Sequence, residues 1–371
     1  MRINKLHLAD FKNYQDIEFD FSERINIFTG DNGAGKTNIL DALYYLSFCK
    51  SYFNPIDSQN IRHDQAFFAI KGIYTNQSDG IDSILCSMKR NEKKRISLNK
   101  KDYERFADHI GTFPLVIISP SDSQMIYDGS DERRRYMDSV ISQFDRNYLE
   151  NLMNYNKVLQ QRNAALKQMS NKANFDTVSL DIWDEQLNRY AIDIYRVRES
   201  FLKDFIPVMS EYYQFVSNEK ESVNIEYKSQ LSDSNFLEQL HLARRKDLAF
   251  GHTTVGIHRD DINFTIEHYP LKKYGSQGQQ KSFLVALKLA QFDYTFKKKG
   301  FKPILLLDDI FDKLDIHRVE QLMKLVSRNE FGQIFITDTN RPRIENIFKD
   351  LDVETRIFEI ENGTVLNHNN L

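Results

Sequence analysis

The chain has 371 residues, of which 41% are hydrophobic and 28% charged, and its formal net charge is −3 at neutral pH. These values are typical of a folded globular protein and exclude a wholly disordered or collagen-like chain. The length predicts two or three domains. Cys49 and Cys86 are the only cysteines, so a disulfide framework or a zinc site is not expected. A nucleic-acid partner would need a local basic face, because bulk charge does not favour one.

The sequence does not predict a membrane partner. No run of residues approaches the ~18 consecutive apolar residues that a membrane span needs. The N-terminal residues MRINKLHLADF have the pattern of a strand rather than that of a secretory leader. We therefore expect a protein of the reducing cytoplasm.

Three short strands are predicted at the N-terminus, with apolar residues recurring around positions 3–8, 17–21 and 25–28. A glycine-rich segment follows the third strand and opens a helical pattern. It matches the P-loop, in which glycines let backbone N–H groups crowd around phosphate oxygens at a helix N-terminus. A plain glycine-rich turn is the alternative, but such a turn would not need the Lys-Thr pair. The expected nucleotide-binding residues are Gly30, Asp31, Asn32, Gly33, Ala34, Gly35, Lys36, Thr37 and Asn38.

Specific chemistry is expected from the end of this segment and from a second, acidic segment. Lys36 should reach the β- and γ-phosphates, and the Thr37 hydroxyl should ligate Mg²⁺. The all-apolar run 304–307 has the pattern of a buried parallel strand, and carboxylates at its C-terminal end lie where open α/β sheets bind ligands. Asp308 is the candidate for Mg²⁺ coordination through water, and Asp309 for activating the attacking water. An acidic helix N-cap is the alternative for this pair.

The middle of the chain is predicted to contain further strands, followed by long helices. Residues 66–118 contain β-rich runs that suggest an extension of the sheet. No Gly or Pro interrupts a helical pattern from Tyr136 to Leu166, and from Leu180 to Phe201 apolar residues recur at heptad spacing. We expect an antiparallel helical hairpin here; the alternative is that both helices are core helices of a second domain.

A third element is the run Ser276-Gln277-Gly278-Gln279-Gln280, which precedes an amphipathic helix. A hydroxyl, free N–H groups and a helix dipole would together form a second anion site. The run is weak by itself, because such residues are common in turns. Its position just ahead of the acidic strand makes it informative.

With these three elements, the sequence resembles the SMC/Rad50/RecF group of ABC-type ATPases, and within this group it is most similar to the RecF family. The resemblance covers nearly the whole chain. It implies an α/β fold: an ABC-type P-loop NTPase head with a mixed sheet, and a helical second domain formed by a short antiparallel hairpin. The head would comprise residues 1–120 and 246–371, with the helical arm at 121–245. The motifs that carry the resemblance are KLHLADFKNY, GDNGAGKTNILDALYYLS, ISPSDSQMIYDGSDERRRYMD, GIHRDDINF, SQGQQ and LLLDDIFDKLD.

The resemblance further implies a site shared by two copies of the chain. The P-loop, Asp308 and Asp309 of one copy would face Ser276, Gln277 and Gly278 of the other, with Asp315 signalling across the interface. Lys36, Ser276 and Asp309 would be the catalytic residues, and Thr37 and Asp308 the metal ligands. Many relatives have Glu where this chain has Asp309, so we expect slow, Mg²⁺-dependent ATP turnover that acts as a switch. Thr337 would stand where transporters have a histidine.

As function, the resemblance implies an ATP-dependent DNA-binding clamp in recombinational repair and replication restart. It would dimerise on ATP and help RecO- and RecR-type mediators to load recombinase at single-strand gaps. The alternative is an ABC-type ATPase head serving another process, such as transport or chromosome organisation. Candidate DNA contacts are basic residues that could equally be a solvated face or be paired internally: Lys89, Arg90, Lys93, Lys94, Arg95, Lys100, Lys101, Arg133, Arg134 and Arg135.

Overall fold

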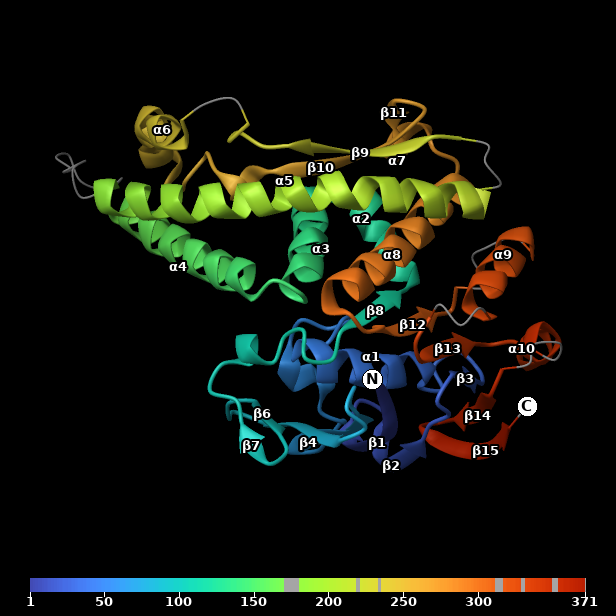
Figure 1. Cartoon of the computed structure of the whole chain (residues 1–371). Helices are drawn as coiled ribbons and strands as arrows, with labels where there is room; N and C mark the ends of the chain where they lie inside the picture. Colours follow the sequence, from blue (N-terminus) through green and yellow to red (C-terminus); the bar gives the residue numbers. More distant parts are fainter. Residues whose placement is uncertain are drawn as a thin grey trace. The chain divides into compact units, whose positions relative to one another are not determined.

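The chain folds into two compact units in this computed structural model (Figure 1). Unit 1 contains Met1–Asp122, Tyr212–Lys220 and Gln277–Leu371, and unit 2 contains Ser123–Glu211 and Glu221–Ser276. Residues 246–276, which the sequence-based division joined to the head, are therefore part of unit 2. The structure describes residues 1–169, 180–217, 221–232, 235–310, 316–327, 331–348 and 353–370.

Unit 1 contains an antiparallel sheet with the order β2-β1-β4-β5-β6-β7. Apolar residues alternate along its longer strands, so one face is buried; in β1 the side chains of Ile3, Leu6 and Leu8 are fully buried. The strands are β1 (Arg2–Phe11), β2 (Tyr14–Asp20), β4 (Phe67–Thr75), β5 (Ile81–Lys89), β6 (Arg95–Leu98) and β7 (Lys101–Asp102).

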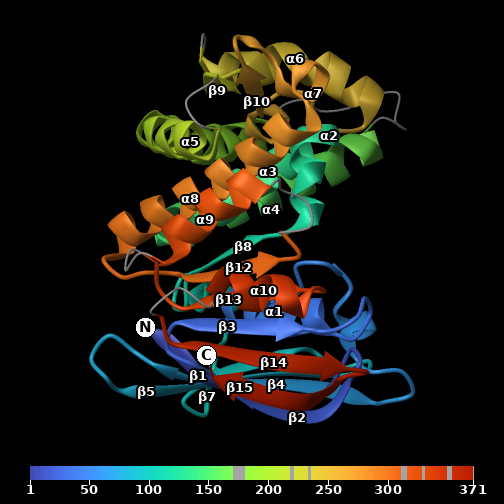
Figure 2. The ribbon, with the colours of Figure 1, turned by 90° about the vertical axis from the view of Figure 1, so that its right-hand side faces the viewer.

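A second sheet of unit 1 has the order β15-β14-β3-β13-β12-β8 (Figure 2). All of its neighbours are parallel except the C-terminal hairpin of β14 and β15. Residues 66–118 were expected to extend the sheet, but their strands divide between two sheets. Strand β8 lies beside β12 here, because long-range pairing decides which sheet a strand joins. The strands are β3 (Ile25–Thr29), β8 (Leu115–Ile118), β12 (Ile304–Asp308), β13 (Ile334–Asp338), β14 (Thr355–Glu361) and β15 (Thr364–Asn370).

Helices cover both faces of this parallel sheet. α1 (Lys36–Phe48) contacts both sheets and shares one hydrophobic core with them. The opposite face packs against α8 (Gln277–Lys299), α9 (Ile316–Ser327) and α10 (Arg341–Phe348). Because both faces are covered, every residue of β3, β12 and β13 is buried, and for β12 the all-apolar run 304–307 predicts this. The described part of unit 1 also contains three short 3₁₀ helices: η1 (Asp57–Asn60), η2 (Phe106–Asp108) and η3 (Pro120–Ser123), whose last residue is already in unit 2.

Unit 2 combines helices with a small antiparallel sheet in the order β11-β10-β9. Its β10 strand pairs with β9 over six positions. The helices are α2 (Gln124–Tyr127), α3 (Ser130–Ser142), α4 (Arg146–Met169), α5 (Asp181–Ser217), α6 (Phe236–Phe250), α7 (Leu271–Tyr274) and the 3₁₀ helix η5 (Ile257–Arg259). Helix α5 belongs to unit 2 as far as Glu211, and its remaining residues belong to unit 1. The strands are β9 (Val223–Lys228), β10 (Asp261–Ile266) and β11 (Tyr269–Pro270).

The predicted antiparallel pair of helices is present as α4 and α5. Arg162 of α4 binds Asp184 of α5 at 2.7 Å, and further along, Arg198 of α5 donates to Tyr148 Oη at 3.0 Å. The expected uninterrupted helix from Tyr136 to Leu166 is wrong, because α3 ends at Ser142. The carboxylate of Asp145 accepts a hydrogen bond from the Tyr148 N–H at 2.9 Å and so begins α4 without any Gly or Pro.

The two helices of the hairpin also contribute to the core of unit 2. Leu248 of α6 packs with Leu166 of α4 and Leu180. Along the heptad of α5, Leu187, Ile194 and Phe201 are buried, whereas the intervening positions are partly buried. The polar connection 170–177 that was expected between the helices lies outside the described residues.

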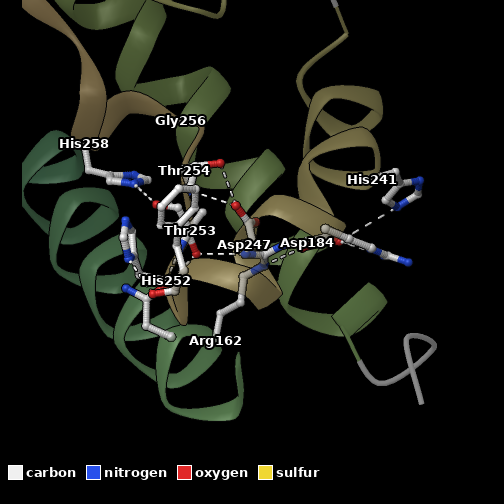
Figure 3. A network of polar contacts seen from close by, with 12 residues as sticks. Arg162, Asp184, His241, Asp247, His252, Thr253, Thr254, Gly256 and His258 are labelled. Carbon is white, nitrogen blue, oxygen red and sulfur yellow. Dashed lines mark hydrogen bonds and ion pairs between the residues drawn. The ribbon is translucent and has the colours of Figure 1, made fainter. Parts of the chain in front are cut away.

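A buried polar network holds α4, α5 and α6 together (Figure 3). Arg162 is fully buried and binds Asp184 and Asp247, each at 2.7 Å, and Thr253 at 2.8 Å. Asp184 also accepts from Arg244 at 2.7 Å. Asp181, Asp184 and His241 come together near this point, but Arg244 supplies the positive charge that balances the two carboxylates. The network therefore serves unit 2 as a structural ion cluster.

Within the described ranges, none of the helices has the length and apolar character required to traverse a lipid bilayer.

Candidate functional site

The glycine-rich loop lies between β3 and α1, as the sequence predicts. Gly30, Gly33 and Gly35 have φ values of 144°, 83° and 118°, which residues with a side chain rarely adopt. A Cβ on Gly30 would lie 2.1 Å from the Ile360 carbonyl oxygen, and one on Gly35 would lie 2.4 Å from the Asn13 amide. Both the backbone conformation and the close packing therefore require glycine at these two positions.

The Lys36 side chain crosses the loop that precedes it. Its Nζ donates to the carbonyl oxygens of Gly30 at 2.7 Å and Asp31 at 2.9 Å, and the residue is buried. The ammonium group is thereby fixed inside the ring of loop residues. An anionic group bound by the loop would meet a cation and the N-terminus of α1 together.

Two turns from distant parts of the chain support the loop from outside. Asn13, in the turn between β1 and β2, donates to the Ala34 carbonyl at 3.0 Å and accepts from the Asn38 amide at 2.7 Å. Tyr14 Oη donates to the Gly35 carbonyl at 3.1 Å, and the Gly363 N–H donates to the Ala34 carbonyl at 3.0 Å. Neither turn was predicted to contact the loop. The one available signal was the presence of the first turn in a family motif.

At the start of α1, Thr37 meets the end of β12. The Thr37 hydroxyl donates to Asp308 at 2.8 Å, although 271 positions separate the two residues. Thr337 donates to the same carboxylate at 2.9 Å, and Ser119 donates to it at 3.4 Å. Burial raises the pKa of the Asp308 carboxyl, while the hydrogen bonds from these hydroxyls act in the opposite direction.

This oxygen cluster fits a hard divalent cation. Mg²⁺ prefers one or two carboxylate or hydroxyl ligands and retains several waters. Thr37 and Asp308 bring such oxygens together at the mouth of the P-loop. Ser119 was not identified from the sequence, because its contact with Asp308 depends on β8 lying beside β12.

Asp309 follows β12 in an unusual backbone conformation, with φ of 49°. Its N–H donates to the Thr337 hydroxyl at 3.0 Å, and the same hydroxyl donates to Asp308. Thr337 thus anchors both the Asp308 carboxylate and the backbone of Asp309 at the end of the strand. A left-handed residue at this place is a local strain of the kind that is common at functional sites.

A buried ion pair connects this region to α8. Lys288 Nζ lies 2.7 Å from Asp122, and both side chains are almost completely buried. Asp122 also accepts from the Ser119 N–H at 2.8 Å and from the Tyr52 hydroxyl at 2.5 Å. Ser119 is the residue that contacts Asp308, so hydrogen bonds and one ion pair lead from Asp308 to α8.

The run Ser276–Gln280, which we call the signature turn, lies at the start of α8. Gln277 is the first residue of the helix, and a Cβ on Gly278 would lie 2.5 Å from the Arg318 guanidinium, so α9 approaches this turn closely. Ser276 is the last residue of unit 2. The role of Ser276, Gln277 and Gly278 toward a second copy stays a prediction. Asp315 lies outside the described residues.

Several candidate DNA contacts are engaged inside the protein. Lys94 is nearly buried and binds Asp57 and the Cys49 carbonyl, each at 2.6 Å. Arg133 binds Asp261 in a bidentate manner at 2.8 and 3.0 Å. These two residues therefore have structural roles. Arg135, by contrast, is 69% exposed and pairs with Glu132 one helical turn away.

Comparison with known proteins agrees with this geometry. The RecF/RecN/SMC N terminal domain family matches residues 2–365. The DNA replication and repair protein RecF of Bacteroides thetaiotaomicron is 48% identical over 98% of both chains. This chain belongs to the RecF family. The RecF protein of Flavobacterium johnsoniae is also 48% identical and covers 97% of this chain and 100% of its own. Members of this family are ABC-type ATPases.

Solved RecF structures share the fold of this family member. The recombination mediator protein RecF in the RecFOR pathway, as RecF-ATPrS and as RecF-ATP, aligns with TM-scores of 0.87 and 0.89 at 30% identity. Both alignments cover 100% of this chain, and 98% and 97% of the respective RecF chains. An Smc head domain from Pyrococcus furiosus aligns at 15% identity with a TM-score of 0.59, which supports the ABC-type head fold alone.

Proposed function

We propose that this RecF-family chain is an ATP-dependent DNA-binding clamp in recombinational repair and replication restart. The observation that carries the proposal is the contact between Thr37 and Asp308, because it joins the P-loop to the acidic strand end in the geometry that a Mg²⁺–nucleotide complex requires. Family membership over the full chain and the ATP-bound forms of solved RecF relatives support ATP as the ligand.

The loop residues would bind the triphosphate. Backbone N–H groups of residues 30–38 and the Lys36 ammonium would hold the phosphate oxygens, with Lys36 exchanging the Gly30 and Asp31 carbonyls for phosphate. Thr37 and Asp308 would hold Mg²⁺, which supplies charge neutralisation on the β- and γ-phosphates. The fixed loop makes this binding preorganised.

Asp309 would orient the attacking water by accepting one of its protons in a hydrogen bond. Its carboxylate is one methylene shorter than the glutamate of many ABC-type ATPases, so its reach toward the water is reduced. Slow turnover follows, which suits a switch whose nucleotide state persists long enough to be read. The positive φ of Asp309 and its bond to Thr337 support a fixed orientation for this group.

Two copies would share each nucleotide. Ser276, Gln277 and Gly278 of one chain would contact the triphosphate that the P-loop of the other holds, so that ATP stabilises the dimer by mass action. The helix that begins at Gln277 is tied through Lys288 and Asp122 to Ser119, which gives the nucleotide a route to influence the signature turn. Closed dimers would encircle or grip DNA in the cytoplasm at single-strand gaps, where RecO- and RecR-type mediators load recombinase.

Sedimentation velocity with and without ATP, repeated with gapped duplex DNA, tests the proposal. The wild-type chain should be a monomer without nucleotide and a dimer with ATP and Mg²⁺. Lys36→Ala should lose ATP binding and dimerisation together. Ser276→Arg should keep ATP binding by the monomer and lose dimerisation, because the larger side chain crowds the shared site. Normal ATP-dependent dimers of Ser276→Arg would contradict the shared site.

A further inference from the structure

Unit 2 contains a cavity of about 540 Å³ whose wall is rich in arginine. Arg134, Arg135 and Arg259 line it, together with His252 and His258. Two carboxylates, Asp131 and Asp138, also line the cavity, but each is bound by an arginine: Asp131 by Arg134, and Asp138 by Arg198 at 2.9 Å. The cavity therefore presents guanidinium groups whose neighbouring acids are already neutralised.

A second cavity of about 470 Å³ continues the first along α4. It is lined by Asn156, Gln160, Asn163 and Lys167, and it shares Asn156 and Asn163 with the first cavity. These four residues are spaced at i, i+4, i+7 and i+11, so they follow one face of the helix over about 16 Å. We call the two adjoining cavities the α4 trough.

The histidines of the trough are fixed by the protein. His258 lies 2.8 Å from the Tyr155 hydroxyl through Nδ1 and 3.1 Å from the Thr253 carbonyl through Nε2, as Figure 3 shows in part. Burial lowers the pKa of His258 to about 4, so this ring is neutral near pH 7. The positive charge of the trough comes instead from its arginines and from Lys167.

Two of these arginines are held only by weak surface interactions. Arg135 pairs with Glu132 across one helical turn and is mostly exposed. Arg259 donates to the Thr253 carbonyl at 3.3 Å, and its side chain is on the surface. Exposed contacts of this kind are readily exchanged for another anion, because solvent screens them strongly. Planar guanidinium groups match the oxygens of phosphate in particular.

We propose that the α4 trough binds the phosphodiester backbone of DNA. A row of amide donors between cations fits a repeating phosphate chain, whose oxygens accept from both kinds of group. Carboxylates of an acidic peptide would satisfy the arginines but would not match the regular row Asn156, Gln160, Asn163 and Lys167 as well. The inference rests on the proposed function, since it says where on this chain the DNA of that function is contacted.

The test compares two variants with the same change in charge. Arg135→Gln/Lys167→Gln/Arg259→Gln removes three cations of the trough. Arg189→Gln/Arg196→Gln/Lys203→Gln removes three exposed cations of α5, away from the trough lining. Fluorescence anisotropy measures binding of a labelled single-stranded oligonucleotide, a duplex of the same length and a polyglutamate peptide, each over a series of salt concentrations. Circular dichroism and ATP binding verify that both variants are folded.

The trough variant should bind DNA about tenfold or more weakly, and its log–log salt slope should be shallower by about 2, because each lost phosphate contact removes roughly 0.7–0.9. The α5 variant should remain close to wild type. A larger loss with the oligonucleotide than with the duplex would assign the trough to single strands, and the reverse would assign it to duplex.

Three outcomes would overturn the inference. Equal DNA binding by both variants would remove the trough from DNA recognition while leaving the proposed function intact. Loss of polyglutamate binding with unchanged DNA binding would assign the trough to an acidic protein segment instead. If the wild-type chain itself binds no DNA with ATP present, the proposed function fails, and the inference fails with it.

Discussion

Thr37 donates a 2.8 Å hydrogen bond to Asp308, and this single contact links the beginning of α1 to the end of β12. The two residues belong to sequence motifs at opposite ends of the chain. Strand β13 lies between β3 and β12 in the sheet, so the P-loop and the acidic pair leave the same edge.

Asp308→Asn should abolish the effect of Mg²⁺ on nucleotide binding. Burial raises the pKa of Asp308, so the folded metal-free protein retains the Asp308 proton to higher pH than the unfolded chain does. Binding of this proton stabilises the folded protein fully at acidic pH, and this contribution to the free energy of unfolding is lost as the pH rises through the raised pKa. In metal-free solution at pH 7, Asp308→Asn should therefore raise the melting temperature, whereas added Mg²⁺ and ATP should stabilise only the wild type. Differential scanning fluorimetry from pH 4 to pH 8 measures both effects.

Thr337→Val should reduce ATP turnover without much effect on ATP affinity. The substitution removes the hydroxyl that accepts from the Asp309 N–H and donates to Asp308. Asp309 would lose its fixed orientation, for which we expect a roughly tenfold lower kcat. Thr337→Ser keeps the hydroxyl and should retain most of the activity. A Thr337→Val enzyme with wild-type kcat would show that Thr337 does not position Asp309.

Asn13→Ala should weaken ATP binding, although Asn13 is not in the P-loop. It removes the hydrogen bond to the Ala34 carbonyl and the one from the Asn38 amide. At about 0.5–1.5 kcal/mol for each of the two bonds, affinity should fall by roughly 5- to 150-fold. Titration with a fluorescent ATP analogue measures the change. In the double variant with Asn38→Ala, the two effects should be less than additive, because they share one bond.

Lys288→Met should destabilise unit 1 strongly. It leaves the carboxylate of Asp122 buried without its cation, which costs about 3–5 kcal/mol for pairs of this kind. The double variant Lys288→Met/Asp122→Asn should recover part of this loss, because the uncompensated charge is gone. Urea denaturation of both variants gives the free energies of unfolding. Equal stability of wild type and Lys288→Met would mean that Asp122 is neutral in the folded chain.

The sequence predicts those parts of the site that are local. The P-loop needs only adjacent residues, and the run 304–307 indicates burial on both faces of the sheet because all of its residues are apolar. Contacts made through pairing of distant strands could not be predicted: Ser119 reaches Asp308 only because β8 joins the parallel sheet, and Asn13 reaches the P-loop from another sheet.

The break between two helices and the burial of a charged residue also could not be predicted from the sequence. The separation of α3 from α4 depends on a cap by Asp145 rather than on Gly or Pro. Lys94 has the appearance of a surface cation in a charged run, yet it is nearly buried against Asp57. In both cases a polar side chain finds a specific partner, which composition and periodicity do not report.

Mixing two inactive variants tests the shared nucleotide site most directly. In a dimer of one Lys36→Ala chain and one Ser276→Arg chain, one site is doubly damaged, and the other combines an intact P-loop with an intact signature turn. ATP hydrolysis measured after mixing should therefore reappear, although each variant alone is inactive, and sedimentation should show mixed dimers. If the mixture stays as inactive as its components at every ratio, the two halves of the site do not come from different chains.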